Sequence, residues 1–505
     1  MTETRKTTEW NRVERDRLAK LEALRERGVP PYAYRFDRTH SAREAIEGLP
    51  ANQEEGDQVR VAGRLIAFRR MGKSSFAHVA DRSGRIQAYF QLNVLGAEGY
   101  ELLDLFDLGD WVGVEGNLFR TRTGEITIRV EHFELLAKTV RPLPLGKEEL
   151  DPETGERRVY SGFSDREARY RQRYADLAVS PEVRQVFEVR ARVVRAIRRF
   201  LDERGFLEVE TPVLQPVYGG AAARPFVTHH NTLDLPLYLR IADELYLKRL
   251  IVGGFERVYE IGKDFRNEGM DRFHNPEFTM LEFYAAFFDY EDVMAMTEDL
   301  LEAVVTDASG GTVVEFGDAK IDFQRPFRRL TMYDALETFA DLDVSSLSDD
   351  ELRQRVRGLG VADAEMLGRG RLIDELFGEL VEPKLTQPTF ITDYPREMSP
   401  LAKPKRGDPE LTERFELIVA GKELANAYSE LNDPFDQRER FQSQIALKEL
   451  GDEEAHELDE DFVRALEYGM PPTGGFGMGI DRLVMVLTNQ PSIRDVILFP
   501  AMRPE

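Results

Sequence analysis

Apolar and polar residues alternate with a period of two from about residue 57 to residue 136. Five runs carry this pattern, separated by the turn signals MGK, RSGR and TRTG: VRVAGRLIAF, SSFAHVAD, RIQAYF, DWVGVEGNLF and EITIRVEHFELL. One helical interruption falls near residues 92–106. Five short strands in about eighty residues predict a small closed barrel of the OB-fold type.

Aromatic residues lie on the second and third of these runs, where barrels of this type bind oligonucleotides. They are Phe76, Tyr89 and Phe90, whose rings are suited to stack on bases. The alternative, which the pattern leaves open, is that about half of them fill the barrel interior.

A helical period precedes the barrel, over residues 9–28. An apolar stripe predicts an amphipathic helix that ends at Gly28-Val-Pro-Pro, with Val13, Leu18, Leu21 and Leu24 on the buried side. The face expected to be exposed is basic and holds Arg12, Arg15, Arg17, Lys20, Arg25 and Arg27. Taken alone, such a face is typical of a solvated helix.

The remainder of the chain predicts a second, larger domain. A stretch rich in proline and charge, residues 141–158, is expected to be a linker between an N-terminal domain (1–140) and a C-terminal domain (159–505). The latter alternates helices with strands whose best examples suit antiparallel pairing, so the predicted fold class is α+β. Residues 307–378, with Gly-Gly turns, acidic runs and few aromatics, are expected to form a helical insertion.

Composition narrows the possible functions. The 505 residues are too many for one hydrophobic core. The absence of cysteine excludes a disulfide framework, a thiolate metal site and a cysteine nucleophile, and it fits a reducing compartment. No run of about 18 apolar residues occurs and the first residues are too polar for a secretory signal, so we expect no membrane segment and a cytoplasmic location.

The charge is strongly acidic, with 68 Lys and Arg against 92 Asp and Glu and a net charge of −24. This excess argues against a general nucleic-acid binder, because phosphate contacts need local Lys and Arg. Two local exceptions are the basic helix at residues 9–28 and the pair Arg69-Arg70 beside Phe76.

The segment 255–290 predicts strand, polar loop, strand. Period two places Arg266 and Glu268 on one face of the first strand. It likewise gathers four residues on one face of the second: Phe278, Met280, Glu282 and Tyr284. Charge at this density is costly to bury without a ligand. An exposed face with salt bridges is the alternative, and it is weakened by the two apolar members.

The segment 414–433 predicts a hairpin that turns at Ala420-Gly421. Glu416 and Glu423 then lie diagonally on one face, close enough to share a divalent cation. Strict alternation places three more polar residues on the other face: Asn426, Tyr428 and Glu430. A one-residue bulge near Leu424 and Ala425 is needed to bring all five into one site. An exposed acidic hairpin is an equally open alternative.

A third segment, residues 469–490, is rich in glycine. Gly474, Gly475, Gly477 and Gly479 precede an apolar helix that opens with Asp481-Arg482. Glycines let the backbone approach a ligand closely, although helix–sheet packing is the plainer explanation. The spacing is neither a P-loop nor a dinucleotide fingerprint.

Together these segments resemble the motifs of class II aminoacyl-tRNA synthetases. RRFLDERGFLEVETPVL resembles motif 1, FRNEG with FHNPEFTMLEFY resembles motif 2, and GMGIDR resembles motif 3. Within the class the chain is most similar to the bacterial lysyl-tRNA synthetases, through EARYRQRYADL, GGAAARPFVTHHN, ADELYLKRL, KELANAYSELNDP and IRDVILFPAMRP. The resemblance covers nearly the whole chain, with residues 307–378 matched least.

The resemblance implies an ATP site. Arg266 matches the motif 2 arginine that contacts the α-phosphate and the amino-acid carboxylate, and Arg482 matches the motif 3 arginine at the γ-phosphate and adenine. Phe278 would stack on adenine, His274 would lie near the triphosphate, and Glu268 would contact the adenosine.

The same resemblance implies Mg²⁺, lysine and tRNA sites. Glu416 and Glu423 correspond to the magnesium ligands, and Phe76 and Gln87 correspond to residues that contact an anticodon base. The implied lysine site consists of Gly220, Glu244, Arg266, Glu282, Tyr284, Asn426, Tyr428 and Glu430. A lysine ammonium has three donors and no acceptor, so carboxylate and hydroxyl oxygens suit it.

The resemblance thus implies a lysine–tRNA ligase that uses ATP, L-lysine and tRNA(Lys) and forms a homodimer through motif 1. Three alternatives remain at this point. One is a related aspartyl or asparaginyl synthetase, which would need a cationic or amide partner in the pocket. The others are an enzyme that lysylates a protein and a non-catalytic tRNA-binding paralogue on the same fold.

Overall fold

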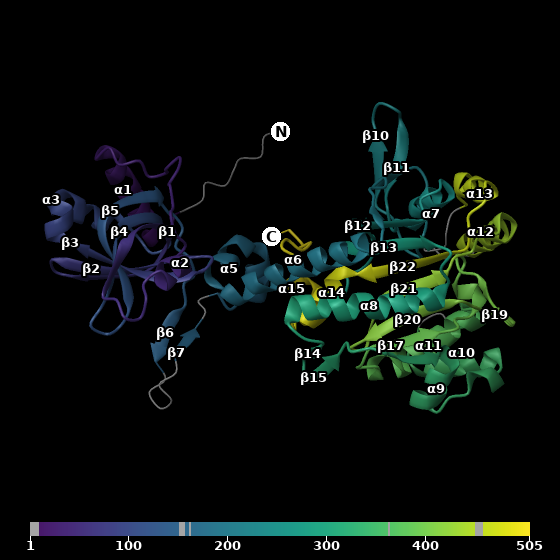
Figure 1. Ribbon diagram of the computed structural model, residues 1–505. Helices are drawn as coiled ribbons and strands as arrows, with labels where there is room; N and C mark the ends of the chain where they lie inside the picture. Colours follow the sequence, from purple (N-terminus) through teal and green to yellow (C-terminus); the bar gives the residue numbers. More distant parts are fainter. Residues whose placement is uncertain (1–9, 151–156, 161–162, 362–363, 450–457, 505) are drawn as a thin grey trace. The chain divides into compact units, whose positions relative to one another are not determined.

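The computed structural model describes residues 10–150, 157–160, 163–361, 364–449 and 458–504 (Figure 1). The chain divides into two compact units, Met1–Val179 and Ser180–Glu505. This division lies about twenty residues beyond the start of the second domain expected from the sequence, residue 159.

The N-terminal unit contains a closed barrel with strand order β1-β2-β3-β5-β4, which confirms the predicted OB-type barrel. All pairs are antiparallel except β3 with β5. The alternation predicted from sequence produces the core, since every second residue of β2 and β3 is buried. The strands are β1 (Glu55–Met71), β2 (Ser74–Asp81), β3 (Gly84–Gln91), β4 (Trp111–Arg120) and β5 (Ile126–Ala137).

Helices cover this barrel. The predicted interruption between β3 and β4 is α3 (Leu92–Leu102), and α2 (Ala42–Glu47) precedes β1. The N-terminal helix is α1 (Arg12–Glu26), which begins at a capping box made by Asn11 and Glu14.

The buried face of α1 differs from the apolar stripe expected. Leu21 and Leu24 are buried as predicted, but Val13 is half exposed, whereas Glu14 and Arg17 are buried. Arg17, predicted on the basic outer face, instead donates to Thr139 Oγ1 at 2.9 Å and to the Leu108 carbonyl at 3.0 Å. Charged residues are buried here because partners distant in sequence satisfy them.

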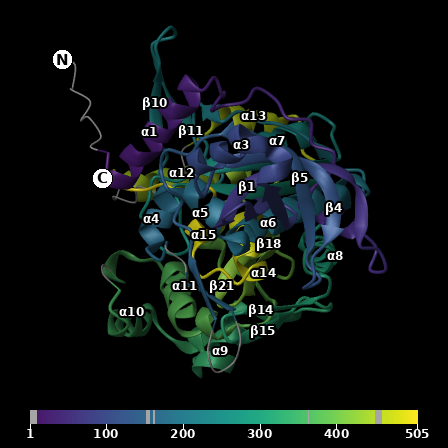
Figure 2. The same ribbon diagram turned by 90° about the vertical axis from the view of Figure 1, so that its left-hand side faces the viewer.

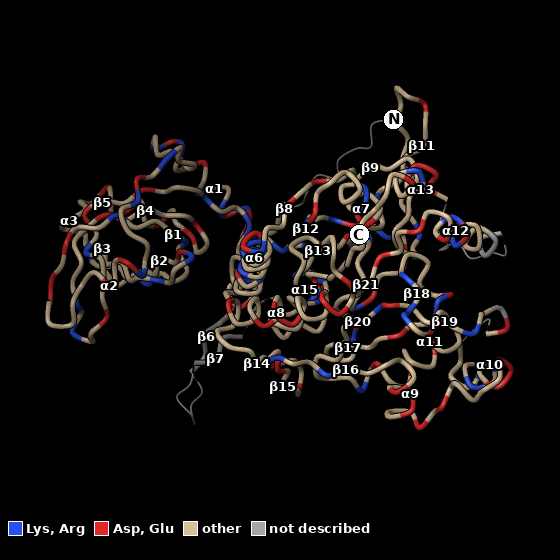
Figure 3. The backbone as a smooth tube through the Cα atoms, turned by 45° about the vertical axis from the view of Figure 1, so that its right-hand side comes forward, with Lys and Arg blue, Asp and Glu red and all other residues tan. Residues whose placement is uncertain are grey.

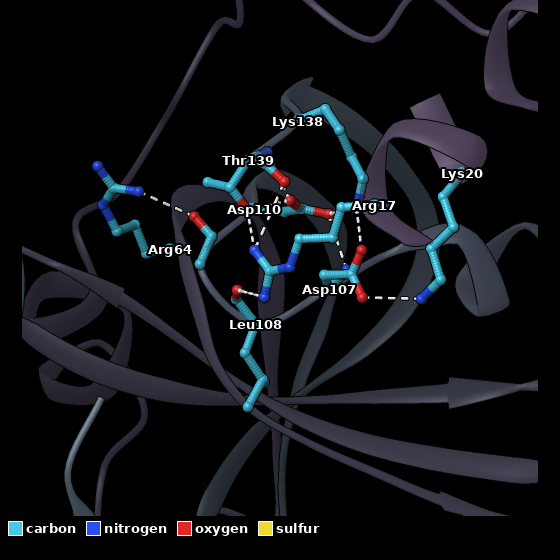
Figure 4. A network of polar contacts seen from close by, with 9 residues as sticks. Arg17, Lys20, Arg64, Asp107, Leu108, Asp110, Lys138 and Thr139 are labelled. Carbon is cyan, nitrogen blue, oxygen red and sulfur yellow. Dashed lines mark hydrogen bonds and ion pairs between the residues drawn. The ribbon is translucent and has the colours of Figure 1, made fainter. Parts of the chain in front are cut away.

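Figure 4 shows the polar network that receives Arg17. Lys138, with no exposed side-chain surface, contacts Asp110 at 2.8 Å and Asp107 at 2.5 Å. Lys20, also predicted on the outer face of α1, contacts Asp107 at 2.7 Å. Two of the six basic residues predicted on the exposed face of α1, Arg17 and Lys20, therefore bind α1 to the barrel.

The expected linker, residues 141–158, contains paired strands. β6 (Lys147–Leu150) and β7 (Arg157–Tyr160) run antiparallel, and residues 151–156 between them lie outside the described part. The unit ends with α4 (Arg166–Arg171) and α5 (Arg173–Val179).

An eight-stranded sheet organises the C-terminal unit, in the order β16-β17-β20-β21-β22-β13-β12-β8. Its central strands are antiparallel, as predicted, and only the outermost pairs β16–β17 and β12–β8 are parallel. The strands are β8 (Leu207–Glu208), β12 (Arg257–Phe265), β13 (Glu277–Ala286), β16 (Arg328–Thr331), β17 (Thr389–Thr392), β20 (Arg414–Val419), β21 (Lys422–Ser429) and β22 (Thr473–Gly479).

Two long helices cross one face of this sheet, α6 (Pro181–Asp202) and α8 (Tyr290–Ser309), together with α14 (Ile480–Leu487) (Figure 1). Their apolar sides meet Tyr259, Leu281, Phe283 and Phe476 in the largest hydrophobic cluster. We call this the core face. Because side chains alternate along a strand, the intervening residues point to the opposite face of the sheet.

That opposite face, which we call the substrate face, is covered at one end by α7 (Glu244–Val252), α12 (Pro434–Glu449) and α13 (Glu460–Glu467). Leu245, Phe441 and Phe462 pack there against Tyr284. Short elements complete the unit: β9 (Leu214–Gln215), β10 (Val227–His230), β11 (Leu235–Leu239), β18 (Pro404–Lys405), β19 (Asp408–Thr412) and α15 (Ile493–Val496).

The expected helical insertion, residues 307–378, holds both helices and strands. β14 (Val313–Phe316) pairs with β15 (Ala319–Asp322), and β16 joins the edge of the main sheet. Three helices follow and lie together beside that edge in Figure 1 and Figure 2: α9 (Met332–Ala340), α10 (Asp349–Gly358) and α11 (Arg369–Leu380). The apolar segments Val313-Val314 and Ile321 are too short to reveal these strands against the charged residues around them.

Both signs of charge are distributed over each unit (Figure 3). Within the described residues, we find no helix with the length and apolar character needed to cross a bilayer.

Candidate active site

The hairpin of β12 and β13 carries the first group of predicted site residues. Its register pairs Glu260 with Glu282 and Gly262 with Met280 on the substrate face. Arg266 follows the end of β12 directly, and its guanidinium carbon lies 5.1 Å from the centre of the Phe278 ring. Phe278, Glu282 and Tyr284 share this surface as predicted, with Arg266 beside Phe278. The placement of Arg266 and Glu268 on the first strand was wrong, because β12 ends at Phe265 and Glu268 lies exposed in the following loop.

The hairpin of β20 and β21 contains the bulge that the sequence argument required. Ala420 and Gly421 form its turn with φ of 55° and 72°. Ile418 lies opposite Glu423, but Leu417 lies opposite Ala425, so Leu424 is the extra residue. This confirms the predicted one-residue bulge near Leu424 and Ala425.

The bulge aligns the polar residues of four neighbouring strands. One cross-strand row contains Glu282, Gly477, Asn426 and Glu416. The next row contains Tyr284, Gly475, Tyr428 and Arg414. Without the extra residue, Asn426 and Tyr428 would point to the core face. The rows therefore show that the three segments predicted separately form a single surface.

Glycines of β22 make this surface accessible. A Cβ placed on Gly475 would overlap Glu430 Oε1 and would lie 2.5 Å from Tyr284 Cε1. One on Gly477 would lie 3.3 Å from Met280 Cε. Close approach, rather than helix packing, thus explains Gly475, whereas neighbouring Gly474 faces the core and Val293.

The residues predicted to bind the substrate lysine converge beside Gly475. Glu430 has no exposed side-chain surface, and Tyr284 donates its hydroxyl to Glu282 at 3.2 Å. Gly220, with φ of 89°, is in contact with Glu244, since a Cβ there would lie 3.2 Å from the Glu244 Cβ. Burial raises the pKa of Glu430 to about 8 and also raises the pKa of Glu244.

Two cations of this region were not identified from sequence. Lys248 lies between Glu244, at 2.5 Å, and Glu430. Arg414 contacts Glu416 at 2.5 Å and Asn426 Oδ1 at 3.3 Å. Lys248 falls one helical turn after Glu244, and Arg414 lies two strand positions before Glu416, so the periodicity of each element could have indicated both.

Glu282 belongs to a buried acidic cluster. Asp243, Asp264 and Glu282 place carboxylate oxygens within 4.8 Å of one another, and Arg240 contacts Asp243 at 2.8 Å and Asp264 at 3.3 Å. Burial, with the Asp264 and Glu282 charges, raises the pKa of Asp243 to about 10. Because Arg240 already supplies a positive charge to the cluster, we assign it no metal.

Two of the residues predicted for ATP, His274 and Glu423, contact Arg482 near the start of α14. Its Nη1 donates to the Glu423 carbonyl at 2.5 Å, and its Nη2 donates to His274 Nε2 at 3.3 Å. The other His274 nitrogen therefore carries its proton and donates to Asp271 at 2.8 Å. A pocket of about 90 Å³ beside Arg482 is lined by Glu423, Leu424, Phe273 and Met485. Glu268 is exposed in the loop between β12 and β13.

Glu416 and Glu423 have the chemistry expected of a magnesium site. Burial raises the pKa of Glu416 to about 8, with Arg414 acting against this shift and the Glu423 carboxylate adding to it. A divalent cation held between the two carboxylates would relieve their repulsion, and Mg²⁺ prefers oxygen ligands of this type. The donor atoms of the pair therefore suit the ion, with Arg414 at Glu416 and Arg482 at Glu423 as the cations beside them.

The barrel presents the predicted aromatic surface. The rings of Phe76 and Tyr89 are stacked, with centroids 4.6 Å apart, on the outer side of β2 and β3, whereas Phe90 is buried inside. Gln87 lies on the outer side too, donating to Glu125 at 2.9 Å and accepting from Thr127. Both alternatives for the aromatics are thus realised, by different residues.

Comparison with known proteins identifies the family. Residues 165–503 match the model of class II tRNA synthetases (D, K and N), and residues 59–136 match that of the OB-fold nucleic acid binding domain. A lysine–tRNA ligase of Christiangramia forsetii is 53% identical over 505 residues, which cover 99% of this chain and 87% of the relative. The chain belongs to the lysine–tRNA ligase family.

Further members of this family match equally well. The lysine–tRNA ligase of Pelotomaculum thermopropionicum is 53% identical over 98% of this chain and 95% of its own length. The lysine–tRNA ligase of Carboxydothermus hydrogenoformans is 52% identical over 98% of this chain and 99% of its own length. The sequence-based assignment to bacterial lysyl-tRNA synthetases is confirmed, and it is favoured over the aspartyl and asparaginyl alternative. The residue roles remain predictions.

Proposed function

We propose that this chain is a lysine–tRNA ligase that activates L-lysine with ATP and transfers it to the 3′ end of tRNA(Lys). The observation that carries the proposal is the register of the substrate face, which brings Tyr284, Tyr428 and Glu430 beside Gly475 and Glu282 beside Gly477. This acceptor-rich pocket lies in a chain whose relatives are lysine–tRNA ligases over nearly their whole length.

The chemistry of the pocket fits a substrate with two ammonium groups. Glu430 and Tyr284 would take the side-chain ammonium, with Glu282 and Tyr428 nearby, because an ammonium offers only donors. Glu244 at Gly220 would take the α-ammonium. All these acceptors are largely withdrawn from water, so their contacts with a cation are worth more than surface contacts.

Activation joins a substrate carboxylate oxygen to the α-phosphorus while the bond to the β-phosphate oxygen breaks and pyrophosphate leaves. This step depends on positioning and charge neutralisation. Arg266 would bind both the carboxylate, with help from Asn426, and the α-phosphate. Phe278 would stack on adenine, and Arg482 would hold the γ-phosphate.

Residues beside Arg482 complete the nucleotide site in this proposal. His274 Nε2 already faces the Arg482 guanidinium and would lie near the triphosphate, while Glu268 would contact the adenosine. Glu416 and Glu423 would hold Mg²⁺, which would supply positive charge for the triphosphate.

The N-terminal unit would recognise the anticodon. The stacked pair of Phe76 and Tyr89 offers a platform for a base, and Gln87 offers an amide for hydrogen bonding. After activation, the terminal ribose hydroxyl of tRNA would attack the adenylate carbonyl, forming the ester and releasing AMP.

We also propose that the enzyme is a cytoplasmic homodimer that associates through motif 1. Apolar side chains remain exposed after α6 in this unit, at Leu207, Val213 and Leu214. Exposed apolar side chains of this kind are suited to a subunit interface. Light scattering of the purified chain is expected to give twice its 57.9 kDa mass, and a monomer at micromolar concentration would contradict the assignment.

The decisive experiment is amino-acid-dependent exchange of pyrophosphate into ATP with the purified chain. L-lysine should support exchange, whereas L-aspartate and L-asparagine should not, because their side chains bring no ammonium to Glu430. Exchange with aspartate or asparagine, or none with lysine, would refute the proposal. Omitting Mg²⁺ tests the role of the ion in the same assay.

A further inference from the structure

Lys248 is a fully buried lysine at the base of the proposed lysine pocket. Its side chain has no exposed surface, and its Nζ contacts both Glu244 and Glu430. These are the two carboxylates that the proposed function assigns to the α-ammonium and the side-chain ammonium of the substrate. The protein's own ammonium thus connects the two ends of the site.

The elements around Lys248 are predominantly acidic. The phenyl ring of Phe462 on α13 lies 6.0 Å from Nζ and brings no charge. The titratable and charged groups that face this site come from α7, β13, β21 and the segments beside them: Glu244, Glu282, Tyr284, Lys403, Tyr428 and Glu430.

The protonation of these groups is linked. Burial disfavours the ammonium of Lys248, but Glu244 and Glu430 outweigh this effect and raise its pKa, so it stays charged at neutral pH. Burial raises the pKa of Glu430 to about 8, and Lys248 acts against that rise. Without Lys248, Glu430 would hold its proton to higher pH.

Lys248 is the cation in contact with the carboxyl groups of the pocket. Three carboxyl groups face the site, Glu244, Glu282 and Glu430, and Lys248 contacts two of them while Lys403 also acts on Glu430. Three unbalanced carboxylates would be more costly to bury and would retain protons.

Resting on the proposed function, we propose that Lys248 is a positioning residue for substrate lysine. It holds Glu244 and Glu430 in place and favours the ionised form of both, so that they can accept hydrogen bonds from the substrate. It contacts the carboxylates and not the reacting atoms, so it acts on lysine affinity and on the pH at which lysine binds.

The test measures KM for lysine and for ATP between pH 7 and 9 in the exchange assay. Lys248→Met removes the charge at similar length. The KM for lysine at pH 7 should rise about tenfold or more, corresponding to about one pKa unit of carboxyl protonation. It should recover as pH rises, because the carboxyl then ionises, while the KM for ATP should stay unchanged.

Two further variants separate charge from shape. Lys248→Arg keeps the charge, so its pH profile should remain that of the wild type even where crowding raises the KM. Lys248→Gln loses the charge but can still donate hydrogen bonds, so it should fold and show the shifted profile. The matched control is Lys263→Met, because Lys263 lies on the core-face side of β12 and pairs with Glu277 at the surface.

Several results would overturn the inference. They are an unchanged lysine KM and profile in both neutral variants, a parallel rise of the KM for lysine and ATP, or failure of both neutral variants to fold, which would give Lys248 a purely structural role. Absence of lysine-dependent exchange in the wild type would instead count against the proposed function.

Discussion

Gly475 is the position where a single added methyl group tests the architecture of the site most directly. The substitution Gly475→Ala would overlap Glu430 Oε1 and would place Cβ 2.5 Å from Tyr284 Cε1. Ordinary contacts begin near 3.4 Å, so the Tyr284 ring must retreat by about 0.9 Å and the Glu430 carboxylate by more. Both groups are buried and have little room to move.

The expected effect follows from this displacement. A misplacement of about 1 Å in a positioned site costs on the order of 100-fold, or about 2.7 kcal/mol of transition-state stabilisation. In pyrophosphate exchange, kcat/KM for lysine should therefore fall about 100-fold, while the KM for ATP should change little. Overpacking should also lower the free energy of unfolding by about 1–3 kcal/mol.

Matched substitutions separate the pocket effect from the stability effect. Gly474→Ala faces the core, where Cβ would lie 2.6 Å from Val293 Cγ2, so it should lose stability and keep the lysine KM. Gly378→Ala, on α11 with nothing within 4 Å, should keep the lysine KM and raise the free energy of unfolding by up to about 1 kcal/mol, because alanine favours the helix. A wild-type lysine KM in Gly475→Ala, or equal changes in Gly474→Ala, would refute the reasoning.

Three further changes test other parts of the molecule. Arg266→Ala should lower lysine-dependent exchange by at least about 1,000-fold without altering thermal unfolding, and near-normal exchange would contradict its role. Phe76→Ala should weaken tRNA charging by about 5- to 150-fold, because about 1–3 kcal/mol of base stacking is lost, while pyrophosphate exchange stays intact. The control Tyr34→Ala, at an exposed tyrosine of the same unit, should change neither tRNA charging nor exchange. Lys138→Met should lower the free energy of unfolding of the N-terminal unit by about 3–5 kcal/mol, because it leaves the buried Asp110 carboxylate without its cation. Lys20→Met, at a partly exposed ion pair, should cost at most about 1 kcal/mol. Equal losses for the two variants in urea titrations would argue against the buried network.

The sequence predicted those parts of the structure in which local periodicity and burial agree. The barrel strands follow period two, and the bulge at Leu424 could be deduced because Glu416, Asn426 and Glu430 can share a site only with one extra residue. The burial of Arg17 could not be predicted, because its partner Thr139 is 122 residues away and its neighbours read as a solvated helix.

The candidate site was predicted less completely than the fold. A sequence pattern identifies residues that a ligand can touch more readily than the cations that balance them. The spacing of Lys248 from Glu244 and of Arg414 from Glu416 indicates that each pair shares a face, but the contact of Lys248 with Glu430 is shown only by the assembled structure. Net charge was similarly uninformative, because −24 for the whole chain conceals local basic positions.

The network of Figure 4 bears on where the N-terminal unit can be cut. A fragment that begins at β1 would contain every barrel strand, yet it would lose Leu24 from the barrel core and Lys20 from Asp107. A fragment that keeps these contacts therefore begins upstream of α1, near Asn11, and not at the start of the matched segment 59–136. A domain limited to the matched residues 59–136 would lack Arg17, Lys20 and Lys138, whose contacts join α1 to the barrel.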